Sequence, residues 1–208
     1  MIEGEKNIEK IHLFPTLVMV CKNFLSNQQS EDIKNFCLLQ KTKPYKNAFD
    51  GSATSTWTSK SKFIEVLEKE ICTLDKLSKN IQSFIDEYSD EFNLRELSIA
   101  NSWFNIQNKQ SVLNRHVHEL SVLSGAIFIN VDDDSSELVL ESPNLYSHYK
   151  SFSPIDYHSM SDIFVIKPEV GMLVLFPSWI VHSSFYQENN TENRIVISFN
   201  VELSDLKK

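Results

Sequence analysis

The stretch RIVISFNVEL, from Arg194 to Leu203, decides the fold class because β-branched and aromatic residues fill it without a helical period. Earlier runs of the same kind are LSIANSWFNI (97–106), VLSGAIFINV (122–131), SELVLE (136–141), DIFVIKP (162–168) and GMLVLFP (171–177). Gly, Pro, Asn and Asp separate these runs, as is typical of short strands joined by turns. We therefore predict that residues 96–203 form the core of a jelly-roll barrel of about eight strands.

The first half of the chain predicts helices that flank this barrel. Apolar residues recur every three or four positions over 28–40 and again over 61–88, so each segment has one face suited to a core. One extended run, HLFPTLVMV (12–20), precedes them and predicts a strand. We expect a single β-rich α+β domain over residues 1–208, a double-stranded β-helix of the cupin-like type, with a helical buttress mainly over 26–92.

The segment between the two helical patterns, residues 41–59, is rich in Thr, Ser, Asn and Gly. This composition predicts a long irregular loop. Long loops in compact domains are often functional, so a substrate lid is one interpretation of the segment. Disorder and simple surface packing are the alternatives.

Composition limits the classes of partner and location. The 208 residues carry a formal net charge of −8, which argues against nucleic acid and anionic membranes as partners. The most apolar stretch, 172–181, is half as long as the ~20 residues that a membrane-spanning helix needs, and the start of the chain has no apolar leader. The three cysteines have no C-x-x-C spacing, which predicts buried free thiols and a cytoplasmic protein.

Three of the six histidines form a pattern that suits a metal ion. His116 and His118 are two positions apart, so on an extended chain both side chains point to one face. His182 follows 64 residues later (182 − 118), directly after the strand-like run GMLVLFP. A pair of this kind alone is weak support for a metal, because strands also carry histidine for packing. The other histidines, His12, His148 and His158, have packing or loop positions as their simplest explanation.

Arg194 strengthens the case for a ligand site. It opens the last strand-like run, on the same face as Val196, Ser198 and Asn200. An arginine that points into a barrel is costly unless it is paired. Because the planar guanidinium matches carboxylate geometry, we expect a carboxylate ligand as its partner.

At this point the order of motifs resembles a known family. H-x-H (116–118), S-x-L-S-G (121–125), G-x-L-x-L-F-P-S-x-x-x-H (171–182) and R-I-x-I-S-F-N (194–200) are similar to the 2-oxoglutarate and iron(II)-dependent oxygenases. An uncharacterised branch with an H-x-H…H iron motif is the most similar, because it shares a W-x-N strand, here 103–105. The resemblance covers roughly residues 99–201.

The resemblance implies roles for individual residues. The metal would be held by His116 and His182, with His118 at the position where the wider superfamily has Asp or Glu. Glu119 is a weaker substitute, because on an extended chain it points away from the face of His118. The pocket for 2-oxoglutarate would be formed by Arg194, which grips the distal carboxylate, and by Ser198, Ser124 and Asn105.

The implied function is that of an oxidoreductase. With Fe(II) and 2-oxoglutarate as cosubstrate, such a dioxygenase hydroxylates a C–H bond of a small molecule or protein side chain and releases succinate and CO2. A three-histidine cupin-type dioxygenase that does not use 2-oxoglutarate is one alternative, and a non-catalytic metal-binding or interaction barrel is another. The expected partner is a small-molecule or peptide substrate, and edge strands are compatible with a homodimer.

Overall fold

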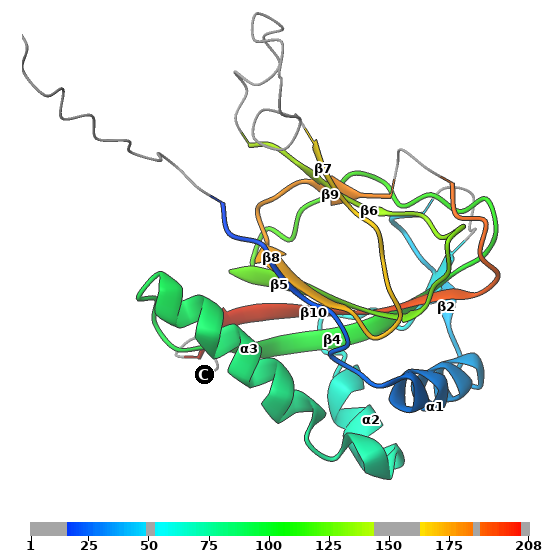
Figure 1. The fold of residues 1–208 in the computed structure, drawn as a ribbon, viewed down its shortest axis with the longest axis horizontal. Helices are drawn as coiled ribbons and strands as arrows, with labels where there is room; N and C mark the ends of the chain where they lie inside the picture. Colours follow the sequence, from blue (N-terminus) through cyan, green and yellow to red (C-terminus); the bar gives the residue numbers. More distant parts are fainter. Residues whose placement is uncertain (1–15, 49–52, 144–162, 185–187, 205–208) are drawn as a thin grey trace, which may run out of the picture.

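The computed structural model describes residues 16–48, 53–143, 163–184 and 188–204. Three layers make up this part of the chain: a helical layer, a large sheet and a small sheet (Figure 1). The strands are β1 (Met19–Cys21), β2 (Lys43–Pro44), β3 (Ala53–Ser55), β4 (Leu97–Gln107), β5 (Leu123–Asn130), β6 (Leu138–Glu141), β7 (Ile163–Ile166), β8 (Leu173–Pro177), β9 (His182–Ser183) and β10 (Arg194–Leu203). The helices are α1 (Asn27–Leu38), α2 (Phe63–Glu70), the 3-10 turn η2 (Cys72–Leu74) and α3 (Leu77–Glu91).

Seven strands form the large sheet in the order β1-β8-β5-β10-β4-β3-β2, and three form the small sheet in the order β7-β6-β9. All strand pairs within these two sheets of the described residues are antiparallel. The predicted fold class is confirmed, and each of the six strand-like runs of the sequence contains a strand. The described residues form ten strands rather than about eight. The sequence did not predict β2, β3 and β9, because each is only two or three residues long.

The helices cover one face of the large sheet. Helix α1 begins at Ser26, whose hydroxyl accepts from the backbone N–H of Gln29, while the Gln29 side chain accepts from the backbone N–H of Ser26. This reciprocal cap satisfies two backbone donors that a helix start leaves free. The helical pattern predicted over 61–88 is interrupted at Ile71, where the backbone is extended with φ −123° and ψ 104°. The break yields two helices that lie on the sheet in different directions (Figure 1).

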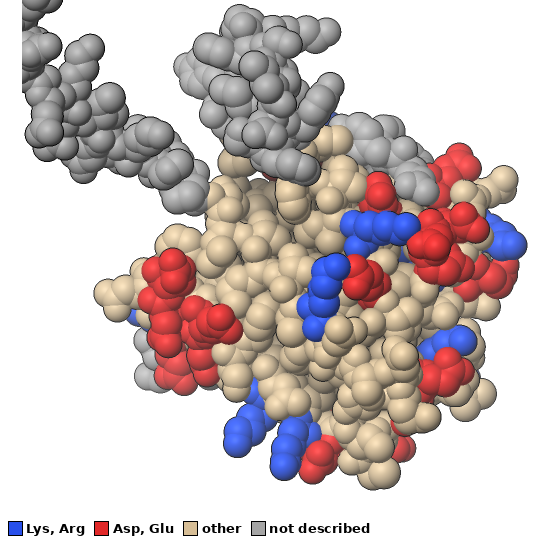
Figure 2. Space-filling view, viewed as in Figure 1, with Lys and Arg blue, Asp and Glu red and all other residues tan. Residues whose placement is uncertain are grey.

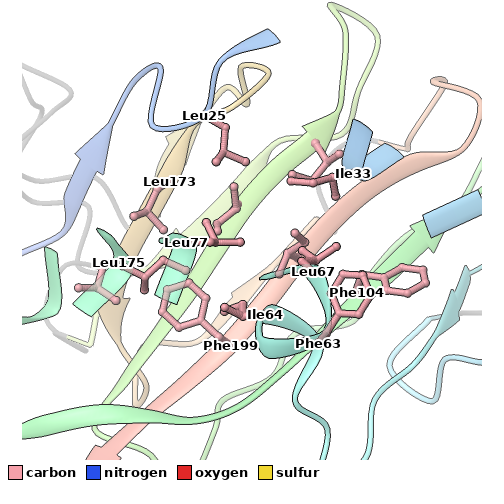
Figure 3. Packing of buried hydrophobic residues seen from close by; sticks show 14 of the residues in the cluster. Leu25, Ile33, Phe63, Ile64, Leu67, Leu77, Phe104, Leu173, Leu175 and Phe199 are labelled. Atoms are coloured by element: carbon pink, nitrogen blue, oxygen red, sulfur yellow. The ribbon is translucent and has the colours of Figure 1, made fainter. Parts of the chain in front are cut away.

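Strand alternation divides the core into two parts. The helix-facing side of the large sheet contributes to a cluster that also contains Leu25 and Ile33 of the N-terminal region and the apolar faces of the helices (Figure 3). In β10 this side presents Ile195, Ile197 and Phe199. A second cluster lies between the two sheets and includes Val196, the next residue on the opposite face of β10. The inter-sheet space is therefore partly apolar and partly polar.

Gly125 in β5 is required by the close approach of Phe199. A Cβ atom added at position 125 would lie 2.0 Å from Cζ of the Phe199 ring. We expect Gly125→Ala to destabilise the fold by about 1–3 kcal/mol, since a buried ring must leave its preferred position. Chemical denaturation would measure the loss, and the double variant Gly125→Ala/Phe199→Leu should recover part of it. Equal stability of Gly125→Ala and the parent protein would contradict this account.

Two local expectations need correction. Residues 41–59 are not one irregular loop, because β2 and β3 extend the large sheet and β3 pairs with β4. The cysteines are all free, but only Cys37 is buried, and Cys72 is exposed. Cys37 lies in the core-facing part of α1, whereas Cys72 lies in the short turn η2 between α2 and α3. His12, His148 and His158 lie outside the described residues.

The surface carries charges of both signs. Figure 2 shows acidic side chains gathered over the end of α3, where Asp86, Glu87, Asp90 and Glu91 lie together. Elsewhere on this face lysines and arginines are interspersed with acidic residues, and no continuous basic area is visible (Figure 2). Among the described helices, none has the length and apolar character needed to cross a membrane.

Candidate metal centre and active site

His116, His118 and His182 meet between the two sheets. One potential ligand atom from each lies within 4.8 Å of the others. The ring centroids are 5.4 Å apart for His116 and His118, 4.2 Å for His116 and His182, and 5.0 Å for His118 and His182. His182 opens β9, and its backbone exchanges two hydrogen bonds with that of His116, which fixes the extended 116–118 segment against it. The predicted convergence of the H-x-H pair on one face agrees with this geometry.

Each imidazole is oriented through its Nδ1 atom. The Nδ1 of His116 lies 2.7 Å from the carbonyl oxygen of Asn114, and that of His182 lies 2.9 Å from the carbonyl oxygen of Ile180. The Nδ1 of His118 contacts the side-chain oxygen of Asn200. A carbonyl oxygen only accepts, so each Nδ1 carries the proton and each Nε2 keeps a free lone pair. Three neutral imidazoles with free Nε2 atoms are the form in which histidine binds a metal.

Burial keeps these imidazoles neutral. The pKa of His118 falls to about 4, chiefly because burial disfavours the charged form. Burial also lowers the pKa of His116, and it lowers that of His182 well below the ordinary value, with a further contribution from the two neighbouring histidines. The site therefore needs no proton release from Nε2 near neutral pH before it binds a cation.

Arg194 lies in the same cavity. It is 3% exposed, and among the described residues no acidic group forms an ion pair with it. One guanidinium N–H donates to the side-chain oxygen of Gln107, while Nε has no hydrogen-bond partner in the part of the chain that the structure describes. Burial lowers its pKa only to about 10, so Arg194 stays cationic at neutral pH. A buried cation without a counter-ion is costly, and an anionic ligand would remove that cost.

The cavity that joins Arg194 to the histidines has about 70 Å³ of space accessible to water, where a single water needs about 10–15 Å³. Asn105, Ser198 and Ser124, the other residues expected at the cosubstrate pocket, all line it. The Oδ1 of Asn105 is buried and has no hydrogen-bond partner within the described segments, and its amide group donates to the Ser198 hydroxyl at 3.4 Å. Ser124 instead hydrogen-bonds to the Nδ1 of His118 at 2.9 Å. The donor set fits a small ligand that carries a carboxylate.

Comparisons with known proteins agree with this geometry. Residues 101–200 match the family model described as "Putative 2OG-Fe(II) oxygenase". Nearly half of the chain is therefore similar in sequence to the 2-oxoglutarate and iron(II)-dependent oxygenases. No curated protein matches the chain by sequence.

Solved structures share the fold of this chain. HygX from Streptomyces hygroscopicus, crystallised with nickel and 2-oxoglutarate, has a TM-score of 0.62 at 9% identity, and the match covers 91% of this chain and 84% of HygX. A prolyl-4-hydroxylase from Pseudomonas putida has a TM-score of 0.58 at 13% identity, covering 90% and 93%. A prolyl hydroxylase from Trichoplax adhaerens has a TM-score of 0.60 at 14% identity, covering 88% and 83%. These likenesses show the fold, and the family match over residues 101–200 together with the three-histidine group fits an oxidoreductase that uses iron(II) and 2-oxoglutarate.

Several side chains that support the oxygenase site were not predicted from the sequence. Gln107 of β4 holds Arg194, and Asn200 of β10 holds His118. Aromatic rings pack on the histidines: Trp103 lies 5.9 Å from His118, and Phe176 lies 4.9 Å from His182, between ring centroids. Strand alternation could have indicated Gln107 and Asn200 from the sequence. Gln107 shares a strand face with Asn105, and Asn200 shares a strand face with Arg194. Glu119 is exposed and does not belong to the metal-binding group.

We expect Asn200→Ala to weaken metal binding about ten- to hundredfold, because loss of the partner that orients a ligating histidine has effects of this size. Competition with a chromophoric chelator would measure the change. Asn200→Asp keeps an acceptor for the Nδ1 proton and should retain most of the affinity. Asn190→Ala, placed in a turn away from the histidines, serves as the control. Unchanged affinity in Asn200→Ala would show that the Asn200 contact does not hold His118 in its ligating position.

Proposed function

We propose that the chain is a hydroxylase that inserts one oxygen atom of O2 into a C–H bond of its substrate. The other oxygen atom enters 2-oxoglutarate, which is oxidised and decarboxylated to succinate and CO2. Iron(II), when bound, supplies the activation of dioxygen that this chemistry needs. The observation that carries the proposal is the buried, unpaired Arg194 in one cavity with His116, His118 and His182.

Each group of residues has a defined task in this proposal. The three histidines hold the metal through Nε2, and the contacts of their Nδ1 atoms fix the ring orientation. Arg194 binds the distal carboxylate of 2-oxoglutarate, and Gln107 keeps its guanidinium in place. The polar side chains of Asn105 and Ser198 complete the pocket. Ser124 is better placed to support His118 than to contact the cosubstrate, because its hydroxyl lies 2.9 Å from that ring.

Apolar side chains form part of the pocket wall. Phe128, Val196 and Phe176 line the cavity and belong to the cluster between the sheets. The guanidinium of Arg194 lies 5.6 Å from the ring centroid of Phe128. A low-dielectric wall strengthens the attraction between Arg194 and a carboxylate. It also limits side reactions of the oxidant with water.

The site differs from the two-histidine, one-carboxylate arrangement through His118. A neutral ligand leaves the metal one unit more positive than a carboxylate would. This difference favours a second candidate function, a dioxygenase in which the substrate itself binds the metal and Arg194 binds the carboxylate of that substrate. The non-catalytic interpretation has less support, because structural zinc sites have four protein ligands and the described residues offer three.

An anaerobic titration tests the proposal. Adding 2-oxoglutarate to the iron(II)-loaded protein should produce a visible metal-to-ligand charge-transfer band, and admission of oxygen should release succinate. Iron binding without the band or succinate would exclude the 2-oxoglutarate mechanism and leave the second candidate. Failure to bind iron would exclude both functions.

Location and assembly belong to the same proposal. Three free cysteines support a reducing compartment, which we take to be the cytoplasm. A single domain over residues 1–208 is supported by the core that the helices share with the large sheet. A homodimer through an edge strand stays a prediction, which size-exclusion chromatography with light scattering would test.

A further inference from the structure

A second and much larger cavity meets the metal pocket at the histidines. Tyr45, Trp103, His116 and His118 line both cavities, so anything bound in the outer one reaches the metal ligands directly. The outer cavity has about 560 Å³ of space accessible to water, against about 70 Å³ for the inner one. The inner cavity suits the small cosubstrate, and the outer cavity is free for a larger molecule.

One end of the outer cavity carries a positive charge. The Lys46 ammonium lies 4.4 Å from the ring centroid of Trp57, and no described carboxylate forms an ion pair with it. Trp57 follows Thr56, whose backbone N–H donates to the carbonyl oxygen of Phe104 in β4. The cationic end therefore lies beside the middle of β4. An anionic group of a ligand would find its partner there.

The other end carries negative charge. Glu119 and Glu202 line the cavity, and neither has an ion-pair partner among the described residues. Glu202 pairs with Ser98 at the start of β4. The segment that contains Glu119 returns to the same end, because the backbone N–H of Val122 donates to the carbonyl oxygen of Val201. A cationic group of a ligand would be bound there.

The separation of the two ends sets the length of the ligand. Phe104 and Ser98 are six residues apart on β4, which corresponds to roughly 20 Å at ~3.3 Å per residue. Both Lys46 and Glu202 line the cavity, so a ligand that contacts both must be shorter than or comparable to this span. A single amino acid extends over only about 3.6 Å, whereas an extended chain of three to five residues covers roughly 10–18 Å.

The floor between the charged ends suits amide groups. Asn47, Asn101 and Asn200 line the cavity, and each carboxamide can both donate and accept, as a peptide group does. The Oδ1 of Asn101 is buried and has no hydrogen-bond partner among the described residues. The rings of Tyr45 and Trp57 offer flat surfaces for apolar side chains between these contacts.

We propose that the outer cavity binds an extended peptide segment of three to five residues. An acidic residue of this segment lies at Lys46, a basic residue lies at Glu119 and Glu202, and a residue between them faces the metal pocket. The inference deepens the proposed function and rests on it for the hydroxylation, although peptide binding itself does not depend on that chemistry.

Fluorescence anisotropy with dye-labelled pentapeptides tests the inference on protein loaded with iron(II) and 2-oxoglutarate under nitrogen. Three peptides are used, each blocked at both termini. Two of them carry Glu and Lys as the first and last residues, one in each order, and the neutral reference has Gln at both positions. One of the two charged orders should bind at least about tenfold more tightly than the neutral peptide. Equal binding of all three peptides, or no binding of any, would overturn the inference.

A charge reversal assigns the contact to Lys46. Lys46→Glu should weaken binding of the preferred peptide about tenfold, since attraction becomes repulsion. A peptide with Lys in place of its Glu should recover binding to this variant. Lys69→Glu, the same change on the exposed face of α2, is the matched control and should have no effect. Failure of the exchanged peptide to recover binding would exclude the Lys46 contact.

The outcomes separate this inference from the proposed function. A charge-transfer band with 2-oxoglutarate but no peptide binding would overturn the peptide inference alone. Peptide binding without the band would keep the peptide site and overturn the proposed function. Displacement of the peptide by a single-stranded oligonucleotide or an oligosaccharide at lower concentration than by an unlabelled peptide would assign the cavity to another class of substrate.

Discussion

Arg194→Met is expected to abolish binding of 2-oxoglutarate. The variant removes the cation that would meet the distal carboxylate in a buried site. Truncating one partner of a buried, hydrogen-bonded charge pair costs about 2–5 kcal/mol, which corresponds to a loss of affinity of roughly 30- to 5,000-fold. Titration calorimetry and the charge-transfer band would both report the loss. Arg115→Met provides the control, because Arg115 forms an exposed ion pair with Glu141.

The same substitution should not destabilise the protein in the absence of ligands. A buried guanidinium without a counter-ion has lost its hydration, and apolar replacements of buried charged groups are often neutral or stabilising by about 1–4 kcal/mol. Arg194→Met leaves the side-chain oxygen of Gln107 without its donor, so the cleaner variant is Arg194→Met/Gln107→Leu. Chemical denaturation of ligand-free protein should show equal or higher stability. A large loss of stability together with unchanged affinity for 2-oxoglutarate would make Arg194 a structural residue.

His182→Ala is expected to reduce iron affinity more than about a hundredfold. It deletes a ligand, whereas loss of a residue that only orients a ligand already costs ten- to hundredfold. Metal analysis after anaerobic loading and chelator competition would measure the effect, and succinate release should fall with it. Lys69→Ala, on the exposed face of α2, is the control and should leave iron binding unchanged. Full iron occupancy in His182→Ala would exclude the three-histidine site.

Strand alternation made much of the site predictable from the sequence. The H-x-H spacing placed His116 and His118 on one face of their extended segment. The two-residue period of β10 placed Arg194 and Ser198 on one face of that strand. Such predictions need only the geometry of an extended chain. Strand alternation alone could not predict how the face of the histidine segment lies relative to the face of β10. The convergence with His182 depends on the pairing of β9 with β6 and with the 116–118 segment.

The contacts that support the histidines and Arg194 were harder to predict from the sequence. Asn200 reaches His118 across 82 residues of sequence, and Gln107 reaches Arg194 across 87. No local pattern specifies such a pair, because the register between strands is set by the whole sheet. Strands β2 and β3 show the same limit, since they have little apolar alternation and become strands because β3 pairs with β4 and β2 pairs with β3. The break at Ile71 was hidden by apolar spacing that continues on both sides of it.

The two faces of β10 separate two properties that evolution or design could change independently. Ile195, Ile197 and Phe199 belong to the helix-facing core, whereas Arg194, Ser198 and Asn200 belong to the site. Point substitutions in the first set should alter the stability of the fold. Point substitutions in the second set should alter the ligands that the protein binds. Insertion or deletion of one residue within the strand would exchange the sets and destroy both properties at once. Natural variants of this chain should therefore differ in β10 by substitution and keep its length constant.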